Sequence, residues 1–436
     1  MLLRPKILVV ILAAGSSVRF KPGPKALPPP KGADLLNLTV KSLRLLGLNS
    51  PLAVANPAQG EVIGLIRELG CRELVNPNPE RGMFSSIRLV FAQSQGEAAL
   101  ILPVDAALVS VDSILSVIDH FLGLPQRDDL AALPAYGRDL GHPPIIGSKL
   151  VKELLAYEGQ GGLRGALAQR GGTEAETQSV GLARLPEGPL PIENSRLRYL
   201  PLDDPLVLTD IDTREDLERF NQIKKNSVFV PKPTPRKALT LLALAGVERK
   251  FDHSLAVAAG ALRLARAIKS SALELTFMGG LLHDLAHGDK GHADRAMERV
   301  LEIGWPKELA TVVGRHTELS ENLRAVLKLI PRTGEKLNDP LTADEIEATF
   351  CVHLADKYIK GPKLVDLETR FNPDWALERP EAKPYIAQRR EDALALDLWF
   401  KRRLNDPVEK ILTTPSDSPL EGLLAMANGG PVGPLI

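Results

Sequence analysis

The sequence predicts an α/β domain followed by an all-α domain. Its 436 residues exceed the ~100–200 residues of a typical domain, so two or three compact units are expected. Short apolar runs alternate with helical patterns up to about residue 220, whereas helical patterns alone follow a proline-rich segment. Hydrophobic and charged residues make up 44% and 25% of the chain, a composition that excludes disorder along the whole chain and a collagen-like architecture.

The first half alternates expected strands with expected helices. Apolar runs bounded by Gly, Pro or Asn predict buried strands at residues 7–12, 52–55 and 99–104. Between them, residues 34–46 and 61–69 carry apolar side chains at the three- and four-residue spacing of one helix face. This alternation predicts a mostly parallel sheet with helices on both faces.

A proline-rich tether marks the domain boundary. In the segment SVFVPKPTPRK, residues 227–237, three prolines stand within five positions, which forbids a continuous helix and favours extended chain. We therefore expect a first domain at 1–222, a linker at 223–237 and a second domain at 238–412. The tail at 413–436 is rich in Pro, Ser and Gly without periodicity, and it is predicted not to pack.

The second domain is predicted to be helical, with few strand-like segments. Helical periodicity is present in residues 238–246, 253–268, 272–287, 292–303 and 307–316.

Charge and cysteine content limit the partners of the protein. Lys plus Arg and Asp plus Glu both count 54, so no global positive field attracts nucleic acid, and any polyanion must be held locally. Two cysteines, Cys71 and Cys351, are too few for a disulfide framework and suit a reducing cytoplasm. The short apolar run at 7–14 resembles a secretory signal, but an internal strand is the preferred interpretation. No stretch approaches the ~18–20 apolar residues of a membrane span.

A turn after the first expected strand is a candidate phosphate site. Gly15 and its neighbours can direct backbone N–H groups at a triphosphate, while Arg19 and Lys25 neutralise its charge. An ordinary strand-to-helix connection would look the same. Asp105 follows another expected strand, where a carboxylate at the edge of the sheet can hold Mg²⁺ against phosphates; a helix cap is the alternative.

Six ordered motifs in residues ~5–220 carry a family resemblance. They are LAAGSSxR followed by Lys25, NPxxExGMxSS at Asn76–Ser86, LPVD ending at Asp105, GHP around His142, GGLRG at Gly161–Gly165, and DIDTRED at Asp210–Asp216. Together they resemble the nucleotidyltransferases that activate the molybdenum cofactor, the MobA-like NTP transferases, and in particular the molybdopterin cytidylyltransferases. The Ala-Ala-Gly and Gly-Met forms look more like the cytidine than the guanosine branch.

The resemblance implies a Rossmann-like nucleotide-diphospho-sugar transferase fold and attack by a molybdopterin phosphate on the α-phosphate of CTP, which releases pyrophosphate. It implies catalytic roles for Lys25 and Asp105, with Asp105 as the chief Mg²⁺ ligand and either Asp210 or Asp212 completing the metal site. His142 would face the acceptor. The nucleotide-binding residues would be Ala13, Ala14, Gly15, Ser16, Arg19, Lys25, Gly82, Met83 and Ser85.

Histidines and aspartates in the second half form another constellation. His253, the adjacent His283 and Asp284, and Asp356 offer imidazole and carboxylate groups, which suit a divalent transition metal that activates water for attack on phosphorus. Any one of these residues alone is more often structural. As a set they resemble the HD family of metal-dependent phosphohydrolases over residues ~245–365.

The HD resemblance implies hydrolysis of a phosphate ester in an all-α domain, with Mn, Fe, Ni, Co or Zn as the metal and Asp284 in a catalytic role. His292 and His316 fall where some relatives hold a second metal or the substrate phosphate. A mononuclear site with these two as outer contacts is the preferred interpretation. His287 and His353 are interpreted as structural, with His353 supporting Asp356 one helical turn later.

The two resemblances predict a bifunctional enzyme. Its expected partners are CTP or another NTP, a molybdopterin-type cofactor, a phosphorylated small molecule or nucleotide at the HD site and a molybdoenzyme, with no nucleic acid and no membrane. One alternative is a nucleotidyltransferase for another phosphorylated acceptor, such as a sugar phosphate. Another is a nucleotide-sensing or cofactor-insertion protein without turnover.

Overall fold

The computed structural model describes residues 5–21, 23–171, 196–246, 248–288, 291–328, 341–371 and 383–413. The chain divides between Pro231 and Lys232 into two compact units, and this division falls within the expected linker at 223–237. The expected tail at 413–436 lies, apart from Thr413, outside the described residues. Among the described residues, no helix combines the length and the apolar character that crossing a bilayer requires.

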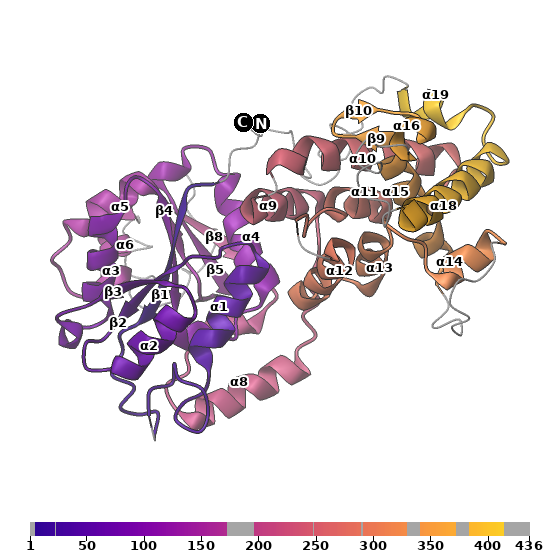
Figure 1. The fold of residues 1–436 in the computed structure, drawn as a ribbon. Coiled ribbons are helices and arrows are strands. Elements are labelled where there is room, and N and C mark those ends of the chain that lie inside the picture. The colour runs from indigo at the N-terminus through magenta and orange to yellow at the C-terminus, as the bar shows by residue number, and fades with distance from the viewer. Residues whose placement is uncertain are drawn as a thin grey trace. The chain divides into compact units, whose positions relative to one another are not determined.

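The first unit is an α/β domain, as predicted (Figure 1). Its strands are β1 (Ile7–Ala13), β2 (Leu52–Ala55), β3 (Arg72–Val75), β4 (Ala98–Pro103), β5 (Ala131–Tyr136), β6 (Asp139–Leu140), β7 (Ile145–Ile146) and β8 (Leu197–Pro201). Its α-helices are α1 (Leu35–Leu45), α2 (Gly60–Glu68), α3 (Met83–Gln93), α4 (Val111–Leu122), α5 (Ser148–Leu155), α6 (Gly162–Gly171) and α8 (Arg214–Asn226).

The sheet of the first unit is mixed. Its strands follow the order β3-β2-β1-β4-β7-β5-β6, and β8 pairs with β5. The pairs among β1, β2, β3 and β4 are parallel, as is the pair of β5 and β8, whereas β7 runs antiparallel to both of its neighbours. The sequence predicted β1, β2 and β4 of the parallel part, whereas it did not predict β3, β5, β8 or the two-residue strands β6 and β7.

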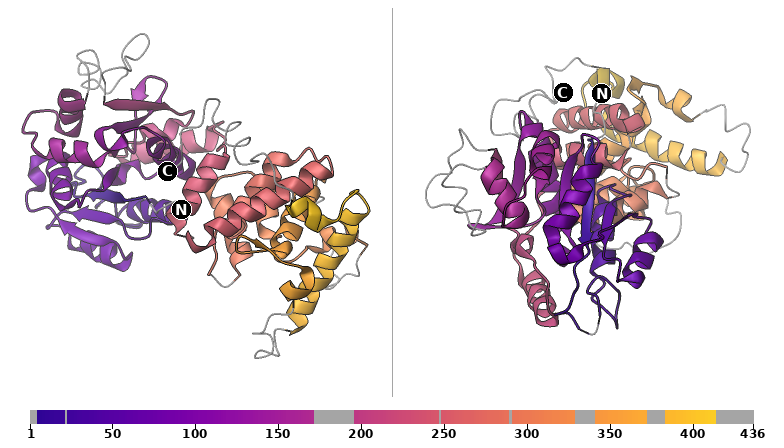
Figure 2. Two further views of the ribbon diagram at one scale, coloured as in Figure 1. Left: turned by 90° about the horizontal axis from the view of Figure 1, so that it is seen from above. Right: turned by 90° about the vertical axis from the view of Figure 1, so that its left-hand side faces the viewer.

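Both faces of the sheet are covered, as Figures 1 and 2 show. In β1, Leu8, Val10 and Leu12 share one hydrophobic core with residues of α3, α5 and α6. The alternate residues Val9 and Ile11 are buried as well, so they face the opposite layer. A strand buried on both faces reads as a continuous apolar run, and this is why the sequence revealed it.

The second unit consists mainly of helices. Its helices are α9 (Pro235–Ala245), α10 (Glu248–Ala267), α11 (Leu273–Leu282), α12 (His292–Ile303), α13 (Lys307–Gly314), α14 (Glu321–Val326), α15 (Ala343–Tyr358), α16 (Leu367–Phe371), α18 (Lys383–Lys401) and α19 (Val408–Thr413). The prediction of an exclusively helical domain misses one hairpin, in which β9 (Ile359–Lys360) pairs with β10 (Lys363–Leu364). Gly361 has a φ of 62°, a conformation that glycine adopts without strain and that lets the chain turn back.

Two boundaries differ from the sequence-based expectations. Helix α11 ends at Leu282, five residues before the predicted end at residue 287. The chain tightens there, because the N–H of Leu285 donates to the carbonyl of Leu282, and the N–H of His287 to that of Asp284. The extended linker is also shorter than residues 223–237, since α8 continues to Asn226 and α9 begins at Pro235, a residue type favoured at the first position of a helix.

Candidate active sites

The first candidate site lies at the carboxyl edge of the parallel strands. Leu12 of β1 pairs with Pro103 of β4, so the turn after β1 and Asp105 after β4 emerge side by side. The N–H of Ile211 donates to the carbonyl of Asp105 at 3.2 Å, which brings the DIDTRED segment to the same place. Three motifs far apart in the sequence therefore converge, at the edge where open α/β sheets bind ligands.

Lys25 joins these motifs through its side chain. It is only 5% exposed, and its Nζ donates to Asp105 Oδ2 at 3.0 Å, to Asp212 Oδ1 at 3.1 Å and to the carbonyl oxygen of Ile211 at 2.7 Å. Arg19 forms a second ion pair with Asp212, at 2.5 Å, from a largely exposed position. Two cations thus stand beside the acidic groups, where the phosphates of a nucleotide would need them.

Three carboxylates gather around Lys25. Oxygen atoms of Asp105, Asp210 and Asp212 lie within 4.8 Å of one another. Burial, followed by the negative charges of Asp105 and Asp212, raises the pKa of Asp210. The sequence left open whether Asp210 or Asp212 joins Asp105, and the structure brings both to it. Such a set of oxygen donors fits a hard cation such as Mg²⁺.

A cavity of about 330 Å³ adjoins these charges. Its walls include eight predicted nucleotide contacts: Ala13, Ala14, Gly15, Ser16, Arg19, Lys25, Gly82 and Met83. Asp105 and Asp212 line it as well. Charged and neutral residues therefore both line the cavity.

Ser85 does not line this cavity, in contrast to its predicted contact with the nucleotide, and Ser86 lines it instead. The Ser85 hydroxyl donates to the carbonyl oxygen of Gly82 at 2.8 Å and accepts a hydrogen bond from Asn76 Nδ2, also at 2.8 Å. Asn76 Nδ2 donates to Ser86 Oγ too, at 2.9 Å. These bonds hold the loop that presents Gly82 and Met83, so the motif organises the wall of the cavity.

Gln59 is a cavity residue that the motifs did not reveal. Its Nε2 donates to the carbonyl oxygen of Gly15 at 3.1 Å, which ties the β2–α2 connection to the candidate phosphate turn. Its Oε1 is buried and has no hydrogen-bond partner among the described residues. The signal that could have identified Gln59 is its place just after a parallel strand, at the same sheet edge as Gly15 and Asp105.

His142 lies near this site without lining the cavity. Its backbone N–H donates to the carbonyl of Val207 at 2.7 Å. Burial lowers the pKa of His142, while Asp105 raises it and Arg164 lowers it, so Asp105 and the GGLRG motif both lie within electrostatic reach of His142. The Nδ1 atom of His142 is buried and has no partner among the described residues. Contact of His142 with the acceptor stays a prediction.

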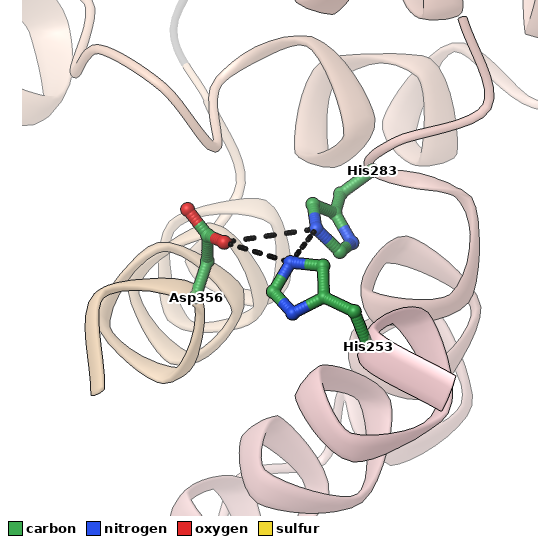
Figure 3. A group of neighbouring side chains, drawn as sticks. All are labelled: His253, His283 and Asp356. Atoms are coloured by element: carbon green, nitrogen blue, oxygen red, sulfur yellow. Dashed lines mark hydrogen bonds and ion pairs between the residues drawn. The ribbon is translucent and has the colours of Figure 1, made fainter. Parts of the chain in front are cut away.

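The second candidate site brings together His253 from α10, His283 from the end of α11 and Asp356 from α15 (Figure 3). The Nε2 atoms of the two histidines are 3.2 Å apart. Asp356 Oδ1 lies 3.3 Å from Nε2 of His253 and 3.7 Å from Nε2 of His283. All three residues are buried, and the sequence had grouped them correctly although they come from distant helices.

The hydrogen bonds of the histidines decide which nitrogen each presents. Nδ1 of His253, His283 and His316 lies 3.2, 2.7 and 2.7 Å from the carbonyl oxygens of Gly361, Gly280 and Val313. A carbonyl only accepts, so each Nδ1 carries the proton and each neutral ring presents the lone pair of Nε2. Burial lowers the pKa of His283 and His316, which favours the neutral rings.

Two lone pairs that face each other at 3.2 Å repel unless a cation lies between them or beside them. The opposed Nε2 atoms of His253 and His283, with the carboxylate of Asp356 next to them, therefore fit a divalent transition metal. The β9–β10 hairpin has a part in this arrangement, because its turn residue Gly361 supplies the carbonyl that orients His253.

Asp284 connects this group to a second one. Its Oδ2 lies 3.7 Å from Nε2 of both His253 and His283, while its Oδ1 lies 3.7 Å from Nε2 of His292 and 3.9 Å from Nε2 of His316. The Nε2 atoms of His292 and His316 are again 3.2 Å apart. The two oxygens of one carboxylate thus face two separate sets of nitrogen donors.

The charges of Asp284 and Asp356 are maintained by their surroundings. Burial raises the pKa of Asp284, but the electrostatic interactions with His283, His316 and Lys250 outweigh burial and bring the pKa to about 2. Burial likewise raises the pKa of Asp356, and Lys357 outweighs this effect and holds it well below the usual range. Both groups are therefore carboxylates at neutral pH, as metal binding requires.

Cations surround the ligands, and the sequence had assigned none of them a role. Lys357 is fully buried and donates to Asp356 Oδ2 at 2.6 Å and to the carbonyl oxygen of His316 at 2.9 Å. Burial lowers the pKa of Lys357 to about 8, although Asp356 raises it. Lys250 Nζ lies 3.4 Å from Asp284 Oδ2, and Arg370 Nη2 lies 3.4 Å from Asp356 Oδ1.

The two histidines interpreted as structural lie beside the ligand groups. Nδ1 of His287 is 3.7 Å from Asp284 Oδ1, and this side chain is 44% exposed. Nδ1 of His353 donates to the carbonyl oxygen of Arg315 at 3.2 Å, so it supports the residue before His316. Its Nε2 is buried without a hydrogen-bond partner among the described residues.

Family comparisons agree with this division into two sites. A model of the MobA-like NTP transferase domain matches residues 9–175, and a model of the HD domain matches residues 251–360. The first range contains Asp105 but not the DIDTRED segment. The second range contains both donor groups of the second site.

Similar proteins come from archaea and bacteria. The uncharacterized protein MJ0778 of Methanocaldococcus jannaschii is 32% identical over 140 residues, which are 30% of this chain and 79% of that protein. A nucleotidyl transferase from Methanothermobacter has 20% identity and a TM-score of 0.39, over 50% of this chain and 99% of its own. The Rv0371C complex with manganese from Mycobacterium tuberculosis H37Rv has 20% identity and a TM-score of 0.35, over 50% and 98%.

Proposed function

Since this chain belongs to the MobA-like NTP transferases in its first unit and carries an HD domain in its second, we propose that it has two activities. The first transfers a cytidylyl group from CTP to a molybdopterin-type acceptor. The second hydrolyses a phosphate compound at a separate two-metal site. A nucleotidyltransferase acts on an NTP and a phosphorylated acceptor. The finer assignment to CTP and molybdopterin rests on the Ala13-Ala14-Gly15 and Gly82-Met83 forms of the motifs.

The position of Lys25 carries the proposal for the first site. Its ammonium group is shared by Asp105 and Asp212 in the wall of a cavity of about 330 Å³. An incoming triphosphate offers stronger anionic partners, and a Mg²⁺ ion, which would be held by Asp105, Asp210 and Asp212, neutralises phosphate charge when bound. Lys25 would then turn from the carboxylates to the phosphates and stabilise the charge that develops on leaving pyrophosphate.

The cavity would receive the nucleoside beside its neutral lining residues. Its wall combines the turn Ala13–Gly15 with Gln59 and with Gly82 and Met83 of α3. Gly82 has a φ of 82° and nothing within 4 Å of the place of a side chain, so a base or ribose can approach the backbone there. His142 is proposed to face the acceptor, within electrostatic reach of Asp105.

Pyrophosphate release tests the first activity. The purified full-length protein with Mg²⁺ is given CTP, GTP, ATP or UTP, each with molybdopterin, with a sugar phosphate or with no acceptor. We expect release that depends on both CTP and molybdopterin. Turnover with a sugar phosphate in place of molybdopterin would refute the assignment of molybdopterin as the acceptor. Turnover with GTP in place of CTP would refute the assignment of CTP as the nucleotide.

The bridging position of Asp284 carries the proposal for the second site. His253, His283 and Asp356 form one donor group, and His292 and His316 with Asp284 form another. The sequence favoured one metal ion with His292 and His316 as outer contacts. We now propose two ions, because these two histidines oppose their Nε2 atoms at the same 3.2 Å as the first pair. Bound divalent ions would activate water and neutralise a phosphoryl oxygen.

The residues of the chain position these donors. The carbonyls of Gly361, Gly280 and Val313 keep the protons of three rings on Nδ1, so the Nε2 lone pairs stay directed inwards. Lys357 is fully buried and donates a hydrogen bond to Oδ2 of Asp356. Oδ1 of Asp356 therefore faces the histidines.

Metal analysis tests the second site independently of catalysis. We expect the full-length protein to bind about two transition-metal ions per chain, and His292→Ala to bind about one. The combined change of His283→Ala and Asp284→Ala, one residue from each ion's donor group, is expected to remove both ions and all phosphohydrolase activity. A stoichiometry of one in the native protein that His292→Ala leaves unchanged would refute the two-ion centre.

A further inference from the structure

Three cations lie around the second site, and only one of them shares its helix with a residue of the ligand set. They are Lys250 on α10, Arg370 on α16 and Arg389 on α18, and we call them the cationic collar. Arg370 and Arg389 lie beyond residue 360, where the match to the HD domain ends. They are therefore contributed by the part of this chain that follows the matched domain.

Two members of the collar stand beside a ligand carboxylate, and the third binds the backbone next to a ligand histidine. Lys250 approaches Asp284, and Arg370 approaches Asp356, both at 3.4 Å. Nε of Arg389 donates to the carbonyl oxygen of Thr317 at 3.1 Å, directly after His316 in the chain. The positive charge of Arg389 also interacts electrostatically with His292, so the collar extends along both donor groups.

The collar differs from Lys357 in its freedom to meet a ligand. The side chain of Lys357 is fully buried and is held by a carboxylate and a carbonyl. The side chains of Lys250 and Arg370 are 33% and 22% exposed, and Arg389 is half-buried. Divalent ions on Asp284 and Asp356 would repel Lys250 and Arg370 from these carboxylates. Because both side chains are long and have access to solvent, they can then bind another anion.

Charge then limits the class of substrate. Two divalent ions would exceed the charge of Asp284 and Asp356, and the collar adds three more positive groups. A phosphate monoester carries only about −1.5 to −2 at pH 7, which leaves most of this excess uncompensated. A chain of linked phosphates supplies more charge and is long enough to reach cations placed beside different ligands.

We propose that the second site hydrolyses phosphoric anhydrides, the class that includes inorganic pyrophosphate and nucleoside triphosphates, and that the collar binds the phosphate that is not attacked. This inference rests on the proposed two-ion centre. A water oxygen bonds to one phosphorus, and the bridging P–O bond breaks with its electron pair on the second phosphate. The proton of the water passes to phosphate or solvent, so pyrophosphate and water give two phosphates. Pyrophosphate is also the product of the proposed first reaction, and its removal would draw that transfer forward.

Equilibrium binding tests the collar without turnover. Methylenediphosphonate, which has a P–C–P bridge that water does not cleave, and methylphosphonate, with one phosphorus, are titrated calorimetrically into Mn²⁺-loaded full-length protein. The variant with His283→Ala and Asp284→Ala measures the binding that belongs to the first site. We expect Arg370→Gln and Arg389→Gln each to weaken methylenediphosphonate binding at least about tenfold, as for the loss of a charged hydrogen bond, and methylphosphonate binding less than about threefold.

Matched variants make the result specific. Lys410→Gln removes an exposed cation of the same unit, paired with Asp406, and is expected to change neither affinity. Arg389→Lys keeps the charge and should recover part of the loss. Unchanged Mn²⁺ content shows that the ligand set is intact in each variant. Equal weakening of both phosphonates by the collar variants, or no weakening of either, would overturn the collar.

Hydrolysis separates the possible outcomes further. The rates of hydrolysis of pyrophosphate and of CTP without acceptor are compared with that of p-nitrophenyl phosphate. Comparing pyrophosphate with CTP distinguishes a free anhydride substrate from a nucleotide-linked one. Preference for either anhydride supports the inference. If the protein binds two ions but prefers the monoester, the anhydride inference is wrong and the proposed function of the second site still holds. If it binds no ions and hydrolyses none of them, the proposed function of the second site fails.

Discussion

Lys25 shows how a single buried charge can prepare a site for a ligand. Burying an ammonium group is costly unless anions surround it, and Asp105 and Asp212 supply them here. The same two carboxylates belong to the triad that fits Mg²⁺. The sequence identified Lys25 and Asp105 through separate motifs, but nothing local to either motif indicates that one binds the other.

Asp105→Asn is expected to lower nucleotidyl transfer by about 100-fold or more, because it removes one charge from the triad and one anionic partner of Lys25 while keeping the shape of the side chain. Pyrophosphate release at saturating Mg²⁺ measures this loss, and circular dichroism checks the fold. Asp129→Asn, which removes a half-buried partner of Lys149 and Arg196 in the same unit, serves as the control and should leave the rate unchanged. A rate within about threefold of the native one for Asp105→Asn would contradict the role.

Gln59→Leu is expected to raise KM for the nucleotide about tenfold, with a smaller effect on kcat, because it removes the hydrogen bond to Gly15 and the acceptor Oε1 from the cavity. Steady-state kinetics with varied CTP measure the two constants separately. Gln93→Leu at the exposed end of α3 is the matched control. An equal loss in kcat with unchanged KM would mean that Gln59 acts on the reaction step instead.

At the scale of elements, the second site depends on how closely α10 and α11 cross. A Cβ atom on Gly280 would lie 2.6 Å from the Cα of Ala258, which is a backbone atom and cannot turn aside. This close approach brings His283, three residues further on, to His253. Asp284 follows the end of α11 at Leu282 by two residues and lies between the two donor groups.

Gly280→Ala is therefore expected to destabilise the second unit by about 1–3 kcal/mol, because the two helices must separate to accept the methyl group. Metal bound per chain should fall in parallel, since the distance between His253 and His283 grows. Thermal unfolding and metal analysis measure the two effects. Gly64→Ala on an exposed part of α2 meets nothing within 4 Å and is expected to stabilise slightly, by about 0.5–1 kcal/mol. A native metal content in Gly280→Ala would contradict this account of the crossing.

At the scale of the whole molecule, the chain is two compact units, each with its own core and its own cluster of candidate metal ligands. The first site offers carboxylate oxygens, which suit Mg²⁺, and the second offers imidazole nitrogens with bridging carboxylates, which suit transition metals. The ligands of each site come from a single unit, so neither site needs residues of the other.

Cutting the chain within residues 227–234 is expected to yield two folded halves that keep their separate activities. After EDTA treatment, Mg²⁺ should restore nucleotidyl transfer in residues 1–226, and Mn²⁺ should restore phosphohydrolysis in the remainder. Activity of each half under both metals is the measurement, and an uncut sample treated in the same way is the control. A transferase half that loses turnover although its circular dichroism is unchanged would show that the units depend on each other.

The sequence alone determined the α/β and helical halves, the strands at β1, β2 and β4 and most of the ligands, because burial on two faces, helical periodicity and motif spacing are written among near neighbours. Only the tertiary structure decided what those residues do together. The bond of Lys25 to Asp105 spans 80 positions and the contact of His253 with His283 spans 30. The bridging place of Asp284, the part of Gln59 and the collar from α16 and α18 likewise depend on packing between distant segments, and no local pattern of residues encodes such packing.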